Sequence, residues 1–448
     1  MNTAYFHGLS GRVVMPCDPL YNQYRQGWNR AIQKYPSVIN YCTNENDVKS
    51  AIIWSRRNGI PLRIRSGGHN YEGYSNGDCV LVIDVSEMDA IELDEQNGLV
   101  RMQPGVLNEQ IYSTVSSRGY PFPGGLCPTV AVSGFTLGGG WGLSCRYLGL
   151  GCDSLEEIEI ADCAGRVLKA SGRVNPDLFW ACRGGGGGNF GVVTELTFRL
   201  PPKTGIVTLV ELDYPDAANS EMEQFIDTWQ RWLIDLDERI TLRAGLYDLS
   251  IEGRGIYGTG IFYGTIAEAQ QILQPFTEIP GGTVSLEEMT FLQAIQIIEQ
   301  SYPSSEKFQN ASGFAFRQYS MLEIRNIVEL IDRRAQGAVN AAVSLYALGG
   351  KVRDVAPRDT AFYYRHAAYI MALQSVWEDD RFASENRQWV YERYGFLKSI
   401  TEGSFVNFPY SCITDYGSEY YGENISRLRR VKCSYDPGNV FCFAQSIR

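Results

Sequence analysis

The sequence has few of the features that mark metal-binding, nucleic-acid-binding or membrane-spanning proteins. It holds only three histidines and no Cys-x-x-Cys pair among its 11 cysteines, which argues against a structural zinc site. Acidic residues outnumber basic ones, 51 against 40, and the net charge of −11 argues against nucleic acid or an anionic membrane as partner. No apolar run reaches the ~18 residues that span a bilayer. We therefore expect a globular protein whose main partner is neither nucleic acid nor an anionic membrane.

The N-terminus also lacks the marks of a secretory signal. Residues 1–8 contain no basic stretch followed by an apolar one. We therefore expect most cysteines to be buried reduced thiols, in a protein that is cytoplasmic or exported by another route, for example into a coat. The odd number of cysteines agrees with a separate use for one of them. No pattern in the sequence indicates an oligomeric state or a disulfide.

The chain is longer than one hydrophobic core usually serves, so we expect two or more domains. Residues 192–200 alternate apolar and polar side chains, which predicts a half-buried strand that Pro201-Pro202 ends. The following 200 residues or so have the pattern of an antiparallel sheet covered by helices. The pattern changes again near residue 404, with a predicted strand at 404–410 and a helix at 421–431. These breaks divide the chain into parts spanning 1–202, 203–403 and 404–448.

The N-terminal part is predicted to start with a strand, a helix and a strand over residues 36–65. The polar segment Thr43-Asn-Glu-Asn-Asp47 favours a helix start, and Asn58-Gly59 favours its end. A continuous apolar strand at 80–85 is expected to be covered on both faces. The second strand of this unit, Leu62–Arg65, runs directly into a glycine-rich turn.

Two nucleophilic side chains lie in glycine-rich turns. His69 follows Arg65-Ser-Gly-Gly, and Cys127 stands in Pro123-Gly-Gly-Leu-Cys-Pro-Thr-Val130. Such turns let backbone N–H groups approach a ligand and cradle a phosphate, and both side chains are suited to a covalent bond with an electrophilic cofactor ring. Taken singly, His69 could instead be an ordinary core or surface histidine, and Cys127 an inert buried thiol.

Together these motifs resemble those of one family. Arg-Ser-Gly-Gly-His, Gly-x-Cys-Pro-Thr-Val and Gly138-Gly-Gly-Trp-Gly142 are similar to motifs of the berberine-bridge-enzyme-like FAD-linked oxidases. Further similar segments begin at Gly149, Asp177 and Tyr421, so the resemblance covers nearly the whole chain. It implies an α+β fold, with an FAD-binding domain of the PCMH (vanillyl-alcohol-oxidase) type formed by the first and last parts. The middle part would form a substrate domain laid over the flavin.

The resemblance also implies covalent attachment of FAD, through its 8α position to His69 and its 6 position to Cys127. Two such bonds prevent loss of the cofactor and raise its reduction potential, so that it accepts hydride from poor donors such as alcohols or sugar hemiacetals. No acidic residue follows the glycines at the spacing of a Rossmann fingerprint, which argues against NAD. The residues expected to contact FAD are Arg65, Ser66, Gly67, Gly68, His69, Asn70, Cys127, Pro128, Thr129, Val130, Ser133, Gly134, Gly138, Gly139, Gly140, Gly142, Val193, Asn439 and Phe441.

The implied activity is that of an oxidase. A base takes a hydroxyl proton, hydride passes to flavin N5, and O2 is reduced to hydrogen peroxide. Carbohydrates oxidised at the anomeric carbon are the expected substrates. Alternatives within the class are a secondary-metabolite or alkaloid oxidase and a dehydrogenase that reacts slowly with O2. An alternative from another class is a structural or coat protein that retains FAD without turnover, which the loss of family tyrosines would favour.

The catalytic base is the least determined feature. The family often uses a Tyr-x-Asn-Tyr segment near the C-terminus, whereas this chain has Phe405-Val-Asn-Phe408. Tyr410 shares the face of Phe408 if the segment is a strand, and Tyr71 matches a family position near the flavin. Trp141 stands where the family often has tyrosine. We expect Tyr71, Tyr410 and Trp141 to be the catalytic side chains, with a packed aromatic as the alternative for Tyr410.

A polar-aromatic run in the middle part supplies candidate substrate contacts. Tyr363, Arg365 and Tyr369 would line the cleft together with Phe408. The alternative is that the run forms an ordinary face of a sheet.

Overall fold

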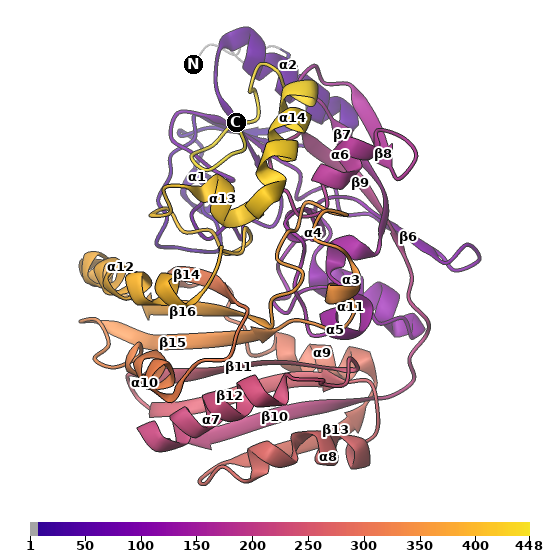
Figure 1. Ribbon diagram of the computed structural model, residues 1–448. Helices are drawn as coiled ribbons and strands as arrows, with labels where there is room; N and C mark the ends of the chain where they lie inside the picture. The colour runs from indigo at the N-terminus through magenta and orange to yellow at the C-terminus, as the bar shows by residue number, and fades with distance from the viewer. Residues whose placement is uncertain (1–7) are drawn as a thin grey trace.

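The computed structural model describes residues 8–448, and the signal-segment expectation therefore falls almost entirely outside the described residues. Three sheets form the framework, as Figure 1 shows: the two smaller ones and the C-terminal segment share the upper part, and the largest sheet lies below. The mixture of helices with mainly antiparallel sheets confirms the α+β class. Within residues 8–448, no helix is both long and apolar enough to cross a membrane.

The first sheet carries the turn that holds His69. Its four strands are β1 (Arg12–Val14), β2 (Val38–Tyr41), β4 (Leu81–Asp84) and β3 (Leu62–Arg65), in that spatial order. Helix α2 (Glu45–Asn58) begins where the Asn44 side chain accepts from two backbone N–H groups, and it ends at Gly59, whose φ of 64° suits glycine. The predicted strand–helix–strand unit is thus confirmed. Strand β4 is buried along its whole length, as its apolar run predicts.

The second sheet has strand β9 (Val192–Arg199) at its centre. Its other strands are β5 (Ile91–Asp94), β6 (Leu99–Met102), β7 (Leu155–Ala161) and β8 (Val167–Ser171), in the order β5-β6-β9-β7-β8. The alternating sequence of β9 predicts a half-buried strand, but only Glu195 and Arg199 escape burial, because helices and loops cover the second face. Short helices connect this part of the chain: α3 (Asn108–Val115), α4 (Val132–Leu137), α5 (Cys145–Leu148) and α6 (Pro176–Ala181).

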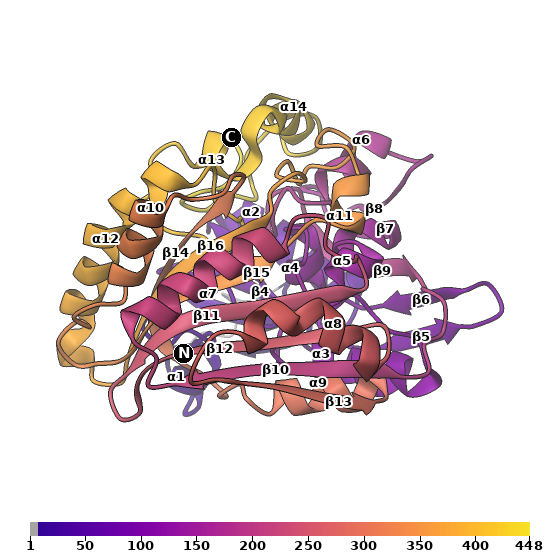
Figure 2. The ribbon, with the colours of Figure 1, turned by 60° about the horizontal axis from the view of Figure 1, so that its bottom comes forward.

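The third sheet is a seven-stranded antiparallel layer. Its order is β13 (Thr283–Met289), β10 (Val207–Pro215), β12 (Gly253–Phe262), β11 (Ile240–Leu249), β15 (Ala338–Ala347), β16 (Tyr369–Trp377) and β14 (Lys307–Ala315). Figure 2 shows helices lying across one face of this sheet: α7 (Asn219–Trp232), α8 (Ile266–Thr277), α10 (Met321–Glu329) and α12 (Ala383–Ile400). Helix α9 (Phe291–Glu299) instead contacts α3. The opposite face is turned toward the N-terminal part, which agrees with the predicted layout.

The C-terminal segment departs from the sequence expectation. The strand predicted at 404–410 is wrong: the chain forms a turn in which the Phe408 N–H donates to the Phe405 carbonyl. The predicted helix at 421–431 is divided into α13 (Tyr416–Tyr421) and α14 (Ile425–Tyr435). Gly422 separates them, and a Cβ there would lie 2.3 Å from the ring of Tyr363. The strands of the third sheet lie between residues 207 and 377, which supports the proposed division of the chain at 202 and 403.

Candidate active site

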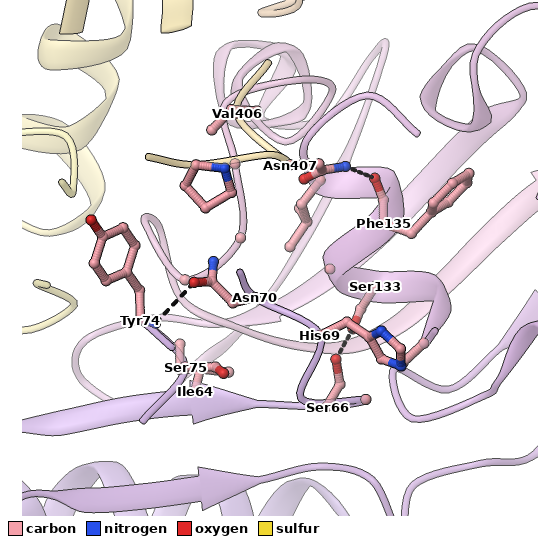
Figure 3. A pocket seen from close by; sticks show the side chains of 18 of the residues that line it. Ile64, Ser66, His69, Asn70, Tyr74, Ser75, Ser133, Phe135, Val406 and Asn407 are labelled. Carbon is pink, nitrogen blue, oxygen red and sulfur yellow. Dashed lines mark hydrogen bonds between the residues drawn. The ribbon is translucent and has the colours of Figure 1, made fainter. Parts of the chain in front are cut away.

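A deep cavity lies where the N-terminal part, the C-terminal segment and the third sheet meet. With its mouth it encloses about 1710 Å³ of space. Figure 3 shows side chains from distant parts of the chain around it, among them Ser66, His69, Ser133 and Asn407. Its wall is supplied mainly by the segments 62–75, 127–137, 186–193, 405–409 and 441–445. The cavity therefore depends on tertiary contacts between the first and last parts of the chain.

The two predicted attachment residues lie next to each other on this wall. The hydroxyl of Thr129 joins them, with its Oγ1 2.8 Å from Nε2 of His69 and 3.5 Å from Sγ of Cys127. The indole of Trp28 stacks on the imidazole with ring centroids 5.2 Å apart. Burial lowers the pKa of His69 to about 4, so the imidazole is neutral near pH 7 and has a lone pair available. Burial raises the pKa of Cys127.

Bare backbone forms another part of the wall. A Cβ added at Gly134 would lie 3.9 Å from the Ser66 hydroxyl, and one at Gly187 would lie 3.8 Å from the Cα of Gly134. Both glycines line the cavity, so a side chain at either position would take up space inside it. The buried Tyr74 hydroxyl in the same wall has no hydrogen-bond partner among residues 8–448. The wall thus offers close backbone approach and a free polar group to a large ligand.

Of the 19 residues expected to contact FAD, 11 line this cavity. These residues are Ser66, Gly67, Gly68, His69, Asn70, Cys127, Val130, Ser133, Gly134, Val193 and Phe441. Thr129 does not line the cavity, but its hydroxyl contacts His69 and Cys127, which do. The glycines at 186–188 also line the cavity. The sequence analysis did not assign them to the site, although their five-residue glycine run was a visible signal.

Other expected contacts have a different role in the structure. Arg65 is buried and pairs with Asp84, and Pro128 lies outside the cavity lining. Asn439 stands in an exposed turn with φ of 49°. The four glycines of the segment 138–142 pack against protein and do not line the cavity. A Cβ at Gly138, Gly139, Gly140 or Gly142 would lie 1.9–2.9 Å from the side chains of Asn407, Phe362 and Phe135 and from the Gly124 carbonyl.

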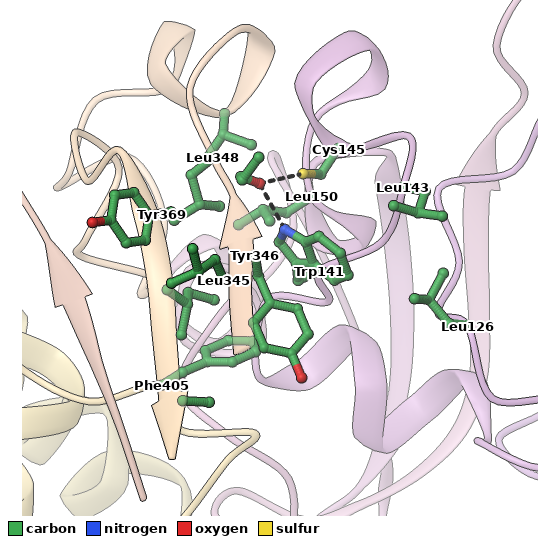
Figure 4. Packing of buried hydrophobic residues seen from close by; sticks show 14 of the residues in the cluster. Leu126, Trp141, Leu143, Cys145, Leu150, Leu345, Tyr346, Leu348, Tyr369 and Phe405 are labelled. Carbon is green, nitrogen blue, oxygen red and sulfur yellow. Dashed lines mark hydrogen bonds between the residues drawn. The ribbon is translucent and has the colours of Figure 1, made fainter. Parts of the chain in front are cut away.

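An aromatic wall stands beside the attachment residues. The rings of Tyr71 and Phe408 are stacked, with centroids 5.2 Å apart and planes 3° from parallel. Phe408 also contacts Tyr346, and Trp141 meets Tyr346 edge to face at 4.9 Å. Figure 4 shows Trp141 held by a hydrogen bond of 2.8 Å from its Nε1 to the Ala347 carbonyl. Tyr71, Phe408 and Trp141 line the cavity as expected.

A cluster of tyrosines around Arg243 extends this wall onto the third sheet, and none of its members was among the site residues predicted from the sequence. Arg243 of β11 is paired in register with Tyr346 of β15, and its Nη1 donates to the Tyr302 hydroxyl at 2.8 Å. Tyr257 of β12 and Tyr346 flank the guanidinium. Alternation along the strands could have grouped these side chains on one face, but the strand pairing that joins them is not visible in the sequence.

Four of the predicted catalytic and substrate residues do not line the cavity. Tyr410 is buried against Tyr394, because the turn at 405–408 removes the strand alternation that would have aligned it with Phe408. Tyr363 packs on Gly422. Arg365 is fully buried in an ion pair with Asp153, and Tyr369 lies on the helix-covered face of β16 against Trp229. The alternative for this run, a packed structural role, is the one that the contacts favour.

This arrangement defines a class of protein. Residues 36–171 match the family model described as an FAD binding domain, and residues 404–448 match the one described as berberine and berberine like. The bare backbone at Gly134 and Gly187 and the unpaired Tyr74 hydroxyl are compatible with FAD in this cavity. The protein is therefore an FAD-linked oxidoreductase.

Comparison with known proteins gives the family. The chain is 35% identical over 445 residues to the uncharacterized FAD-linked oxidoreductase YgaK of Bacillus subtilis (strain 168), covering 98% of this chain and 97% of that protein. The structure of BBE-like 1 from Physcomitrella patens superposes with a TM-score of 0.90 at 24% identity, over 99% of this chain and 98% of that one. The structure of glucooligosaccharide oxidase from Acremonium strictum superposes at 0.89 and 20% identity, over 98% and 97%. The chain belongs to the berberine-bridge-enzyme-like FAD-linked oxidases.

Proposed function

We propose that the protein binds FAD covalently through both His69 and Cys127 and oxidises an alcohol or a sugar hemiacetal, with O2 as electron acceptor. The observation that carries this proposal is the shared Thr129 hydroxyl, which brings the imidazole and the thiol together on one wall of the cavity. The name of the Acremonium strictum structure gives its cofactor as 6-S-cysteinyl, 8α-N1-histidyl FAD. The same pair of residue types therefore has a precedent on this fold.

The residues around the cavity have separate roles in this proposal. FAD, when bound, would supply the acceptor for a hydride, which carries both electrons of the oxidation. Phe408 and Trp141 provide flat apolar surfaces that orient a substrate and exclude water. The phenol of Tyr71 is the proposed base for the substrate hydroxyl proton, because Tyr410 lies outside the cavity. Burial raises the pKa of Tyr71, while the positive charge of Arg243 acts to lower it.

Two measurements test the proposal. Acid-precipitated protein should remain yellow, and peptides containing His69 and Cys127 should carry flavin mass. Complete release of the colour into the supernatant would exclude covalent attachment. A panel of mono- and oligosaccharides mixed with the enzyme without oxygen should bleach the flavin, and readmitting oxygen should restore the colour with hydrogen peroxide formed. Bleaching without reoxidation would indicate a dehydrogenase.

The aromatic wall supports a second candidate, the oxidation of an aromatic secondary metabolite. Tyr71, Phe408 and Trp141 present their rings to one side of the cavity, and such rings bind flat apolar molecules. The same bleaching assay with aromatic alcohols distinguishes the candidates. Bleaching by these compounds and by none of the sugars would favour the second.

A further inference from the structure

The face of the third sheet that meets the cavity carries an arginine near its centre. Arg243 stands on β11, between Leu242 and Ala244, which are fully buried on the opposite, helix-covered face. Its Nη1 donates to the hydroxyl of Tyr302, and Tyr302 itself lines the cavity. The absence of a side chain at Gly245 lets the ring of Tyr257 pack there, since a Cβ would lie 3.0 Å from that ring. The sheet thus holds a positive charge beside the substrate side of the cavity.

This charge has no carboxylate partner in the part of the chain that the structure describes. Among residues 8–448, no Asp or Glu oxygen lies within 4.0 Å of the Arg243 guanidinium. It is surrounded by the rings of Tyr257, Tyr346 and Tyr302, with centroids 5.2, 5.4 and 6.0 Å from Cζ. Its Nε is buried without a hydrogen-bond partner in the described part of the chain. Cation–π contacts compensate only part of the cost of withdrawing a guanidinium from water.

Three buried arginines elsewhere in the structure, Arg65, Arg365 and Arg146, each have a carboxylate or backbone carbonyl oxygens as partners. Arg65 pairs with Asp84, and Arg365 donates to both carboxylate oxygens of Asp153. Arg146 donates to several backbone carbonyl oxygens, including that of Ile240 at 2.8 Å. Arg243 differs from them because, among residues 8–448, neither a carboxylate nor a backbone carbonyl oxygen accepts from its guanidinium, which is surrounded by tyrosine rings. A site that keeps such a charge next to a binding cavity is suited to a ligand that brings the missing anion.

One acidic side chain lies farther away and does not fill this role. Glu306 acts on Arg243 at long range, and its Oε2 accepts from the Gln374 amide at 3.0 Å. Burial raises the pKa of Glu306 to about 7, so a substantial fraction of it is neutral under physiological conditions. The other titratable groups facing the guanidinium are Tyr71, Tyr257, Tyr302 and Tyr346. None of them supplies a fixed negative charge at neutral pH.

We propose that the cleft binds its substrate through an anionic group, a carboxylate or a phosphate, which pairs with the guanidinium of Arg243. The inference rests on the proposed oxidation in this cleft and narrows the substrate to an acidic alcohol or acidic sugar. Guanidinium binds such groups through two parallel N–H···O bonds, which fixes orientation as well as affinity. The hydroxyl to be oxidised is then held at a defined distance from the anion, beside Tyr71.

A binding experiment tests the anion site without requiring turnover. The flavin absorption of the loaded enzyme is titrated with benzoate, phenyl phosphate and the neutral benzamide. Benzoate or phenyl phosphate should bind at least tenfold more tightly than benzamide, and Arg243→Gln should weaken that ligand about 10- to 100-fold. Arg254→Gln is the matched control, because Arg254 pairs with Asp332 and contacts Met222 on the helix-covered face. It should leave all three affinities within about twofold.

Two further variants separate charge from fold. Arg243→Lys keeps the positive charge but loses the two parallel N–H donors of the guanidinium, and should bind the anions with intermediate affinity. Tyr302→Phe removes only the hydroxyl that accepts from Nη1, and should keep the preference for benzoate over benzamide. Equal affinities of wild type for the anions and benzamide would overturn the proposal even if Arg243→Gln does not fold. Anion binding that survives Arg243→Gln would overturn it as well.

A turnover experiment distinguishes this inference from the function on which it rests. Wild type and Arg243→Gln are mixed anaerobically with glucose, glucuronate and glucose 6-phosphate, which share one hemiacetal. If an acidic sugar reduces the flavin faster than glucose does, and Arg243→Gln loses this difference, both the anion site and sugar oxidation are supported. Anion binding that depends on Arg243, with no reduction by any sugar, would refute sugar oxidation and leave the anion site standing. If Arg243→Gln slows reduction equally for glucose and both acidic sugars, Arg243 acts by lowering the pKa of the neighbouring tyrosines. That result would overturn the anion site.

Discussion

The substitution Thr129→Val gives the most direct test of how the attachment wall is organised. Valine preserves the shape of the threonine side chain and removes the hydroxyl that lies 2.8 Å from Nε2 of His69 and 3.5 Å from Sγ of Cys127. In the tautomer with its proton on Nε2, His69 donates to Oγ1, the hydroxyl donates to the sulfur, and Nδ1 keeps a free lone pair. We predict that this form, in which Nδ1 is the nucleophile, is the one that attaches FAD, with the Thr129 hydroxyl as the acceptor that orients the imidazole.

The size of the effect follows from the cost of leaving this buried donor unpaired. That cost is about 1–3 kcal/mol, which corresponds to a change of roughly 5- to 150-fold in the population of the oriented tautomer. The first flavin bond at His69 should form more slowly by a similar factor. The bond at Cys127 should be affected less, because a hydroxyl contact with sulfur at 3.5 Å is weaker. Thr129→Ser keeps the hydroxyl and serves as the matched control.

The assay compares covalent flavin at each site after expression and during incubation of apoprotein with FAD. Acid precipitation measures total attached flavin, and peptide mass analysis divides it between His69 and Cys127. Thr129→Val should show a deficit at His69 that Thr129→Ser largely restores. Attachment at His69 in Thr129→Val at the wild-type rate would refute the reasoning, because the hydroxyl would then have no role in orienting the imidazole.

Other substitutions test the remaining assignments. Tyr71→Phe should slow flavin reduction by on the order of 10²-fold or more. Because burial raises the pKa of Tyr71, the rate of flavin reduction in the wild type should rise with pH above neutrality. A rate that does not depend on pH would contradict the role of Tyr71 as base. Tyr410→Phe should reduce flavin near the wild-type rate in rapid mixing, since Tyr410 lies outside the cavity. His69→Ala and Cys127→Ala should each retain one bond and lower the flavin potential, measured by redox titration; an unchanged potential would exclude that bond. Gly134→Leu should lower the FAD content of the purified protein, because the leucine side chain would enter the cavity. A full complement of FAD in this variant would show that the cofactor does not lie against the backbone at Gly134.

The sequence by itself determined the local features of this protein. The Asn44 cap and Gly59 set the ends of α2, and the apolar run of β4 predicted its complete burial. His69 and Cys127 were identifiable because each stands in a short glycine-rich motif whose residues are adjacent in sequence. These features depend on interactions over a few residues, so they can be read in order along the chain.

Features set by packing between distant segments were decided only by the tertiary structure. Phe405–Tyr410 has the composition of a strand, but it forms a turn that sends Tyr410 away from the cavity. The glycines at 138–142 look like a cofactor loop, yet they make room for side chains such as Phe135 and Phe362. Two of the contacts join distant parts of the chain: Asn407 donates to the Phe135 carbonyl 272 positions away, and Phe362 packs against Gly139 from the segment between β15 and β16.

The cluster around Arg243 illustrates the same division for function. Its members come from β11, β12, β15 and the segment after α9, and each is an unremarkable tyrosine or arginine in its own strand. The order β12-β11-β15 brings them together on one face of the sheet. Alternation along a strand fixes which side chains share a face, but strand order and register arise from the folding of the whole sheet. The nucleophiles were therefore visible in the sequence, whereas the unpaired charge beside them required the fold.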